Sequence, residues 1–393
     1  MTDSSSPPIL LQDIEPKGIL SYGPDTGSIL LGPLNVIVGP NGSGKSNLIE
    51  VIDLIRNTPG GIQKVIRRGG GASEWLWKGS RNPAADVATS WLPNRSSQIS
   101  FHHEIRLAKI EATLWVESES IALYDGAKVD YILYQHFQGT RKVIPIGGNE
   151  VHLEPDAALF RDSILSQLRD PHNYPGLYSL SEAYESIRIY REWSFGRNTI
   201  FRDPQKADER NDRLAEDFSN LGLVLNRLRR NPKAKRAILD HLSDLYDGIT
   251  DFDVIVEGGT VQVFLTEGDF TIPATRLSDG TLRYLCLLAI LLDPDPPRLI
   301  CIEEPELGLH PDIVTKIADL LIDASTRTQL IVTTHSEILI DAMTEHPEAV
   351  LVCEKHEGQT VMHRLNADDL KEWLKKYRLG QLWLRGDIGG TRW

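Results

Sequence analysis

The chain has 393 residues, 41% of them hydrophobic, so it can bury a substantial core as one large domain or two smaller ones. Its 42 basic residues are outnumbered by 55 acidic ones, and the net charge of −13 argues against a broad surface for nucleic acid or membranes, although a local basic groove remains compatible. No apolar run is as long as a membrane span, and the N-terminal residues do not have the pattern of a signal peptide, so we expect a cytoplasmic protein.

The three cysteines, Cys286, Cys301 and Cys353, lie in apolar runs without CxxC spacing. This pattern excludes the usual zinc arrangements and a disulfide framework. We expect buried free thiols.

Residues 9–11 and 27–38 have the composition of strands, with Pro33 dividing the second. The second strand leads into a glycine-rich turn and then into an apolar helix that runs to about Arg56. Such a turn gathers backbone N–H groups around an anion at the positive end of a helix dipole. The lysine of this turn is expected to reach the β- and γ-phosphates of a nucleotide, and the hydroxyl after it to hold Mg²⁺. The residues predicted to bind the nucleotide here are Gly39, Pro40, Asn41, Gly42, Ser43, Gly44, Lys45, Ser46 and Asn47.

After this helix the sequence pattern changes first to that of a loop and then to that of β-strands. Residues 57–61 end the helix, and residues 67–73 are predicted to form a mobile glycine-rich loop. Alternating apolar residues predict a hairpin over residues 99–116, with further strands over 131–137 and 142–153, as an antiparallel layer beside the nucleotide.

Residues 156–246 are predicted to be mostly helical and compact. Two buried helix faces are expected, one carried by Leu214, Phe218, Leu221, Leu225 and Leu228 and the other by Ile238, Leu242 and Leu245. No heptad pattern is long enough for an extended coiled coil. Strands over residues 252–256 and 260–265 follow, joined by a glycine hairpin turn.

A second set of polar residues follows in the last third of the chain. Residues 277–281 precede an apolar helix over 282–292, so Ser278 and Gly280 stand at a second helix N-terminus suited to an anion; alone, this is also an ordinary helix cap. A buried strand over 298–302 ends at Glu303 and Glu304, and a strand over 328–333 ends near His335. In a phosphate site, one carboxylate supports Mg²⁺ and the next polarises the attacking water.

The ordered motifs GPNGSGKS, LSDGT, LICIEEPELGLHP and IVTTHSE resemble those of the ATP-binding-cassette ATPases of the SMC and RecF branch, most closely the small prokaryotic RecF-like ATPases. The resemblance covers about residues 9–100 and 270–365. It implies an α/β P-loop fold of the ABC/SMC-head type, with a mixed central sheet, flanking helices, an antiparallel β layer and a compact helical insertion. The implied division is an ATP-binding core over residues 1–100 and 270–365, the β layer and insertion over 101–269, and a tryptophan-rich tail over 366–393.

The resemblance also implies a role for each matching residue. Residues 39–46 are the Walker A loop, residues 277–281 with Ser278, Asp279 and Gly280 the signature, and residues 307–310 the D-loop. Glu304 is the catalytic carboxylate and His335 the switch histidine, while Ser46 and Glu303 hold Mg²⁺, although Glu303 stands where most of the superfamily has Asp. Gln63 is the positional candidate for the Q-loop, but it also suits an exposed helix end.

The implied mechanism is a homodimer in which each ATP is bound between the Walker A loop of one chain and the signature of the other. ATP would close the dimer and hydrolysis would open it, because both halves share one γ-phosphate. The favoured function is an ATPase switch that regulates a separately encoded effector in anti-phage defence. A DNA repair ATPase and a non-hydrolytic ATP-gated scaffold are the alternatives.

Two further segments are left with two interpretations each. The basic run over residues 227–236 suits either DNA or RNA contact or a solvated helix turn. The tail contains Trp373, Trp383 and Trp393, which suit either anchoring to the core or binding of a partner.

Overall fold

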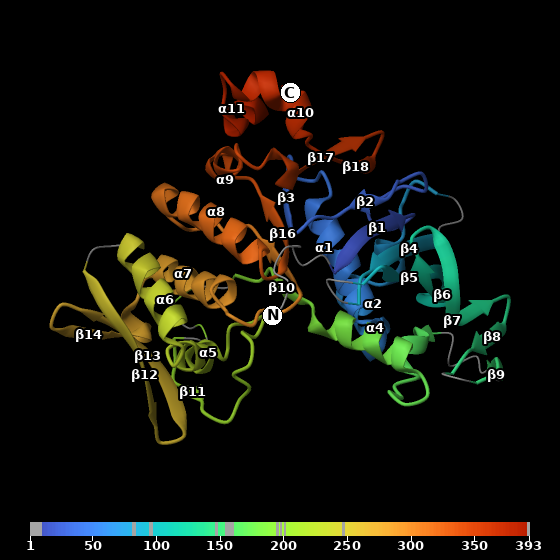
Figure 1. Ribbon diagram of the computed structural model, residues 1–393, viewed down its shortest axis with the longest axis horizontal. Coiled ribbons are helices and arrows are strands. Elements are labelled where there is room, and N and C mark those ends of the chain that lie inside the picture. Colours follow the sequence, from blue (N-terminus) through green and yellow to red (C-terminus); the bar gives the residue numbers. More distant parts are fainter. Residues whose placement is uncertain are drawn as a thin grey trace.

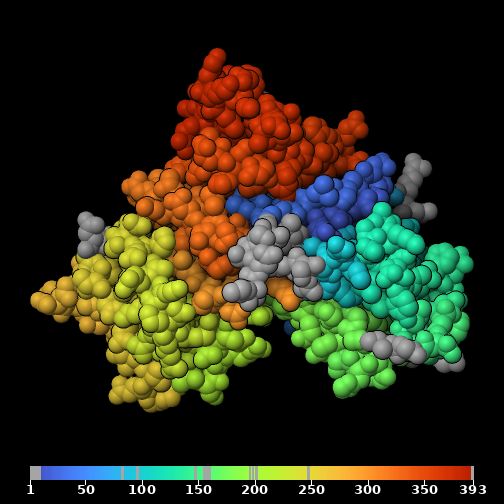
Figure 2. Space-filling view, viewed as in Figure 1, coloured from blue at the N-terminus to red at the C-terminus, as the bar shows by residue number. Residues whose placement is uncertain are grey.

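The computed structural model describes residues 10–80, 84–93, 97–145, 148–153, 161–193, 196, 199, 202–245 and 248–390. A central sheet carries two lobes, one formed by the antiparallel β layer and the other by the insertion (Figures 1 and 2). Within the described residues, we find no helix with both the length and the apolar character that a membrane span requires.

The central sheet has six strands in the order β10-β15-β16-β3-β17-β18, all parallel except the last. Side chains on successive strand residues point to opposite faces. In β3, Val36 and Val38 therefore pack with helices α7 and α8, whereas Ile37 packs with α1 and the β layer. The strands are β3 (Leu34–Val38), β10 (Arg188–Tyr190), β15 (Leu299–Glu303), β16 (Gln329–Thr334), β17 (Val350–His356) and β18 (Gln359–Arg364).

Helices cover both faces of this sheet, as predicted for a P-loop fold (Figure 1). The helix after the glycine-rich turn ends at Arg56, where it was predicted to end. The helices of the core are α1 (Lys45–Arg56), α7 (Asp279–Leu291), α8 (Pro311–Ser325) and α9 (Glu337–Ala342).

The β layer is an eight-stranded sheet in the order β2-β1-β4-β5-β6-β7-β8-β9. The predicted hairpin over residues 99–116 forms its centre as β5 and β6. The strands are β1 (Leu11–Lys17), β2 (Ile29–Leu30), β4 (Ala84–Trp91), β5 (Ile99–Ile110), β6 (Thr113–Asp125), β7 (Lys128–Phe137), β8 (Thr140–Val143) and β9 (Val151–Leu153). Short helices α2 (Gln63–Arg68) and α3 (Ala72–Trp75), together with α4 (Pro175–Ser186), lie beside this layer and α1.

The insertion is less helical than predicted. Leu214 and Phe218 are buried, but Phe218 has a φ of 62°, in the left-handed region, and helix α5 begins only after it. The elements of the insertion are α5 (Leu221–Leu228), α6 (Pro232–Leu245), β11 (Gln205–Lys206), β12 (Ile249–Glu257), β13 (Thr260–Glu267) and β14 (Phe270–Pro273). The predicted glycine hairpin joins β12 to β13.

Several predicted boundaries differ from the structure. The first strand was placed over residues 9–11 but runs from Leu11 to Lys17, with residue 9 outside the described residues. The predicted mobile loop over 67–73 is largely helical, because Arg68 ends α2, Ala72 begins α3 and only three glycines separate them. The predicted domain division also differs at two places. Strand β10 was assigned to the insertion but belongs to the central sheet of the core. Strands β1, β2 and β4 were assigned to the core but pair within the β layer.

The tail docks on the core through its second helix. Its helices are α10 (Ala367–Leu374) and α11 (Leu379–Leu384). Leu379 and Leu382 are fully buried, and α11 packs so closely on α9 that a Cβ on Gly380 would lie 2.9 Å from the Glu337 carbonyl oxygen. Trp383 donates to the Gly390 carbonyl at 3.2 Å, whereas Trp373 is 45% exposed. The anchoring role fits Trp383, and Trp393 lies outside the described residues.

Candidate functional site

The glycine-rich loop joins the carboxyl end of β3 to the start of α1. Gly39 and Gly44 have φ values of 155° and 111°. A Cβ at Gly39 would lie 2.1 Å from the Cys353 carbonyl oxygen, and one at Gly44 would lie 2.0 Å from Thr360 Oγ1. The backbone therefore requires glycine at both positions, for its conformation and for its close neighbours. The result is an anion cradle at a helix N-terminus.

Lys45 lies across this cradle with only 5% of its surface exposed. Its Nζ donates to the carbonyl oxygens of Gly39 at 2.8 Å and Pro40 at 3.1 Å. Burial lowers the pKa of Lys45, and the nearby Cys353, Glu304 and other carboxylates oppose that shift. Among the described residues, no carboxylate forms an ion pair with Lys45, so a bound phosphate would supply a negative charge directly opposite this cation.

The rear of the cradle is held by residues that the motif does not include. Thr360 Oγ1 on β18 donates to the Ser43 carbonyl at 2.6 Å, and the Tyr22 hydroxyl donates to the Gly44 carbonyl at 3.2 Å. Asn47, predicted to bind nucleotide, donates its amide to Ser21 Oγ at 2.6 Å. These partners come from distant parts of the chain, so no sequence pattern indicated them.

Ser46 and Glu303 meet at the mouth of the cradle, as the predicted magnesium site requires. Ser46 Oγ donates to Glu303 Oε2 at 3.3 Å. Within the described residues, Glu303 Oε1 is buried without a hydrogen bond and lies 4.0 Å from Arg191 Nε. Burial raises the pKa of this carboxyl group, while Arg191 opposes the shift. A hydroxyl and a carboxylate that meet in this way fit Mg²⁺, which prefers oxygen ligands and completes its shell with phosphate and water. No cluster of three His, Cys, Asp or Glu side chains suited to a metal occurs among the described residues.

Glu304 and His335 lie together at the same edge of the sheet. His335 Nε2 is 3.5 Å from Glu304 Oε1. Burial, reinforced by Lys45, lowers the pKa of His335, so the imidazole is neutral at pH 7. Glu304 has a φ of 47°, in the left-handed region, and its N–H donates to the Thr333 carbonyl at 2.9 Å. The structure thus brings together the carboxylate and histidine that sequence analysis predicted to act on water and γ-phosphate.

Glu306 holds the backbone next to this pair through two hydrogen bonds. Its Oε1 accepts from Thr334 Oγ1 at 2.5 Å and from the His335 N–H at 3.1 Å. Burial raises the pKa of Glu306. Sequence analysis did not assign Glu306 a role, although the third acidic residue of Glu303-Glu304-Pro305-Glu306 was the available signal.

The signature residues lie at the N-terminus of α7. Ser278 caps this helix, since its Oγ accepts from the Thr281 N–H at 3.0 Å, and Asp279 pairs with Arg202. A Cβ on Gly280 would lie 3.5 Å from the Gly308 carbonyl oxygen in the D-loop. Ser278 and Asp279 are exposed. Across the described part of the chain, no hydrogen bond or ion pair joins residues 278–280 to residues 39–47.

Two other candidates are engaged elsewhere. The amide of Gln63, the positional Q-loop candidate, donates to the carbonyl oxygens of Leu114 at 2.8 Å and Arg161 at 2.6 Å, within the β layer and its neighbouring loop. Half of the charge in the basic run is paired: Arg227 with Asp293, Arg229 with Asp253, and Lys235 with Asp251. Pairing of this kind fits the solvated-helix interpretation better than a surface for nucleic acid.

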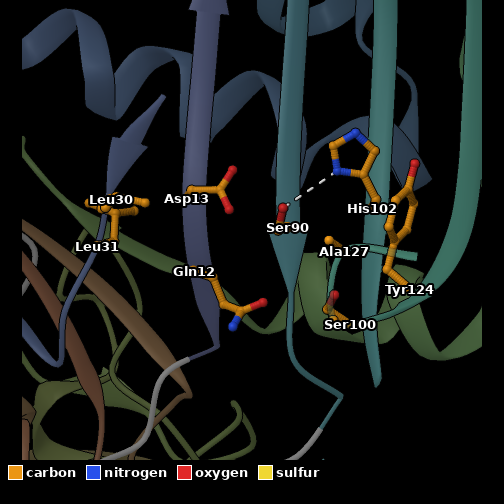
Figure 3. A pocket seen from close by; sticks show the side chains of 10 residues that line it. Gln12, Asp13, Leu30, Leu31, Ser90, Ser100, His102, Tyr124 and Ala127 are labelled. Atoms are coloured by element: carbon orange, nitrogen blue, oxygen red, sulfur yellow. Dashed lines mark hydrogen bonds between the residues drawn. The ribbon is translucent and has the colours of Figure 1, made fainter. Parts of the chain in front are cut away.

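A separate hollow of about 540 Å³ lies on the β layer and contains a serine and a histidine (Figure 3). Asp13, Ser90 and His102 follow one another on neighbouring strands, and Ser90 Oγ lies 3.4 Å from His102 Nδ1. In a hydrolytic triad the histidine stands between the nucleophile and the carboxylate. Here the serine stands between the other two, so this hollow does not have the order that such catalysis needs.

Comparisons with known proteins agree with the cradle and the fold. A family model described as "AAA domain, putative AbiEii toxin, Type IV TA system" matches residues 34–91 and 148–341, more than half of the chain. No curated protein matches the chain in sequence.

Solved structures of Smc heads are similar in fold. One is an SmcHead bound to the C-winged helix domain of ScpA, with a TM-score of 0.57, 17% identity, and 92% of this chain and 99% of that chain covered. A second, from Pyrococcus furiosus, is bound to the C-terminal domain of ScpA, with a TM-score of 0.55, 15% identity and coverage of 93% and 99%. A third, from Pyrococcus yayanosii, has a TM-score of 0.51, 13% identity and coverage of 93% and 99%.

Proposed function

The chain belongs to the family described as "AAA domain, putative AbiEii toxin, Type IV TA system" and shares its fold with Smc heads, and we propose that it binds Mg²⁺ and ATP, hydrolyses the nucleotide and acts as a switch of the SMC/RecF-like ABC type. The observation that carries this proposal is the convergence of Lys45, Ser46, Glu303, Glu304 and His335 on one edge of the central sheet.

Each of these residues has a task that its surroundings favour. Lys45 and the loop N–H groups would neutralise the β- and γ-phosphates. Ser46 and Glu303 would hold Mg²⁺, which when bound draws charge from the phosphate oxygens. Glu304 would orient and polarise the attacking water, and neutral His335 would donate a hydrogen bond toward the γ-phosphate.

We further propose that two chains close head to tail around two ATP molecules. The exposure of Ser278 and Asp279 supports this idea, because this helix N-terminus faces solvent and the Asp279 carboxylate is already paired with Arg202, which leaves the helix end accessible to the phosphate of another chain. The dimer would open when hydrolysis removes the γ-phosphate that both chains contact.

The switch would act on a separately encoded effector in anti-phage defence. Support comes from the family description, which names a putative toxin, and from two of the Smc heads, which were solved with a bound ScpA domain. A DNA repair ATPase and a non-hydrolytic scaffold remain the alternatives, and the paired basic run gives the first of these no added support.

Steady-state phosphate release by the purified chain, with Mg²⁺ and ATP, tests the proposal. We expect turnover that disappears when the metal is chelated. ATP binding without any phosphate release would leave the scaffold function and exclude the ATPase switch.

A further inference from the structure

The peptide groups before and after Glu304, the predicted catalytic carboxylate, are held by two side chains that belong to none of the sequence motifs. Trp193 Nε1 donates to the Glu303 carbonyl oxygen at 2.7 Å, and Arg283 Nη2 donates to the Glu304 carbonyl oxygen at 2.8 Å. The Glu304 N–H donates to the Thr333 carbonyl. A glutamate in the left-handed region persists only where its surroundings fix it, and these three bonds do so from three different segments.

The two side chains also hold each other. The guanidinium carbon of Arg283 lies 4.4 Å from the centre of the Trp193 ring, and Trp193 stacks on Phe218 with ring centres 5.0 Å apart. Arg283 is only 4% exposed. Burial lowers its pKa to about 10, so it is still charged at neutral pH. A charged donor enclosed by an aromatic ring has little freedom to leave its carbonyl acceptor.

Arg283 belongs to α7, the helix whose N-terminus carries the signature. The same helix lies beside the D-loop at its start, where a Cβ on Gly280 would be at ordinary contact distance, 3.5 Å, from the Gly308 carbonyl oxygen. The signature helix is therefore joined to the chain around Glu304 by the Arg283 hydrogen bond, and its N-terminus lies next to the D-loop. A helix moves as a rigid body more readily than it deforms. A displacement of the helix at Ser278 would therefore move Arg283 and, through its hydrogen bond, the Glu304 carbonyl group.

We propose that Arg283 and Trp193 are positioning residues for ATP hydrolysis, which tie the orientation of the Glu304 carboxylate to the position of the signature helix. This inference rests on the proposed function and adds a form of regulation. A phosphate bound by the signature of one chain aligns the hydrolytic carboxylate of that same chain. In a closed dimer, ATP bound in one composite site would then increase the rate of hydrolysis in the other.

The test separates alignment of Glu304 from ATP binding. Arg283→Met keeps a long side chain against Trp193 but removes the donor to Glu304. We expect kcat to fall roughly tenfold to a hundredfold, the range for a small misplacement of a catalytic group, while ATP affinity and the ATP-dependent dimer stay at wild-type levels. Arg283→Lys, which retains a charged donor, is expected to recover part of kcat.

Trp193→Phe is a second and milder variant, because it removes the indole N–H yet keeps an aromatic ring between Arg283 and Phe218. We expect a smaller loss of kcat with ATP affinity unchanged. The matched control is Arg327→Met. Arg327 donates to the Leu291 carbonyl at the other end of α7, also at 2.8 Å, and lies outside the site. Its loss is expected to leave kcat unchanged.

Each outcome decides between the hypotheses. If both Arg283→Met and Trp193→Phe retain wild-type kcat, or if ATP affinity falls as much as kcat, the positioning role is overturned and the proposed function stands. If the wild-type chain shows no turnover, the proposed function fails, and this inference fails with it. If Arg327→Met loses as much activity as Arg283→Met, the effect is general to α7 and not specific to Glu304.

Discussion

The cradle and the signature are both helix N-termini suited to an anion, but they are built in opposite ways. At the cradle, a cation is buried over its own loop and several carboxylates crowd the sheet edge beside it. At the signature, Ser278 satisfies its own helix, Asp279 is paired with Arg202, and the surface is exposed. The cradle therefore holds buried charge that bound phosphate and Mg²⁺ would compensate, whereas the polar groups of the signature are satisfied within one chain. This difference is the basis of our proposals that one chain binds the nucleotide and that closure involves a second chain.

The largest effect is expected from removing the cradle's cation. Lys45→Ala takes away the charge that faces the β- and γ-phosphates, so ATP affinity should fall roughly tenfold to a hundredfold, as for the loss of a charged hydrogen bond, and turnover should become undetectable. Isothermal titration calorimetry with ATP measures the affinity. Lys371→Ala, on exposed helix α10, is the matched control. Wild-type affinity in Lys45→Ala would contradict the cradle assignment.

The next effect separates binding from chemistry inside the cradle. Glu304→Gln should keep ATP affinity but lower turnover by roughly a hundredfold or more, since it removes a group that acts in the transition state. It should also hold the ATP-bound dimer closed, which size-exclusion chromatography with light scattering would detect. If Glu303→Gln loses turnover and Glu304→Gln does not, the two carboxylates have the reverse roles.

A third experiment places the cradle substitution and the signature substitution in two different chains and mixes them. Ser278→Glu places a negative charge where the partner's phosphate is expected, so it should spare ATP binding and block hydrolysis. Mixed with Lys45→Ala, it forms a dimer in which one composite site carries both changes and the other carries neither. Some phosphate release should return, up to about a quarter of wild type if the chains pair at random in a twofold dimer.

The same mixture also bears on the coupling through Arg283. The intact composite site uses the Glu304 of the chain whose own signature is blocked, so recovery below a quarter would measure that coupling. The loss of this coupling is expected to lower turnover by roughly tenfold to a hundredfold and not to abolish it. A mixture whose subunits exchange and that releases no phosphate at all would show that each chain completes its own site.

The cradle could be predicted from the sequence because its residues follow one another along the chain. A buried strand, fixed glycines and an apolar helix place Lys45 and Ser46 without any help from the rest of the fold. Glu303, Glu304 and His335 were accessible for a related reason, since parallel strands end at a common edge. The family and the fold that these motifs indicated are confirmed by the comparisons.

The residues that hold the site in place were not accessible. Trp193 follows a three-residue strand too short to show a period, and Thr360 reaches the cradle from β18 at the far end of the chain. Short helices such as α3 also fall below the length at which a helical pattern can be recognised, so residues 67–73 were predicted as a loop. Contacts between distant segments depend on the completed fold, and a single sequence does not record them.

The smallest expected effect is a change in melting temperature when one carboxylate is neutralised. We expect an increase at Glu306, beside the cradle, and a decrease at Asp279, in the signature. Burial raises the pKa of Glu306 above 4.5, so the folded protein holds this proton more tightly than the unfolded chain does. The carboxyl group therefore favours folding at low pH, and that contribution is lost as pH rises through the folded pKa. The charge that forms is buried, and its Oε2 has no hydrogen bond to the part of the chain that the structure describes. Glu306→Gln retains an oxygen for Thr334 and His335 but carries no charge. Its melting temperature should exceed that of wild type at about pH 7, and the difference should vanish below pH 4.5.

The matched substitution in the signature is Asp279→Asn. It removes a carboxylate that is already paired with Arg202, so it should lower the melting temperature at neutral pH instead of raising it. Differential scanning calorimetry of both variants from acid to neutral pH tests the pair. If Glu306→Gln is destabilised at neutral pH to the same degree as Asp279→Asn, the buried Glu306 carboxylate does not destabilise the folded chain. The contrast between buried carboxylates at the sheet edge and a paired, exposed carboxylate in the signature would then be wrong.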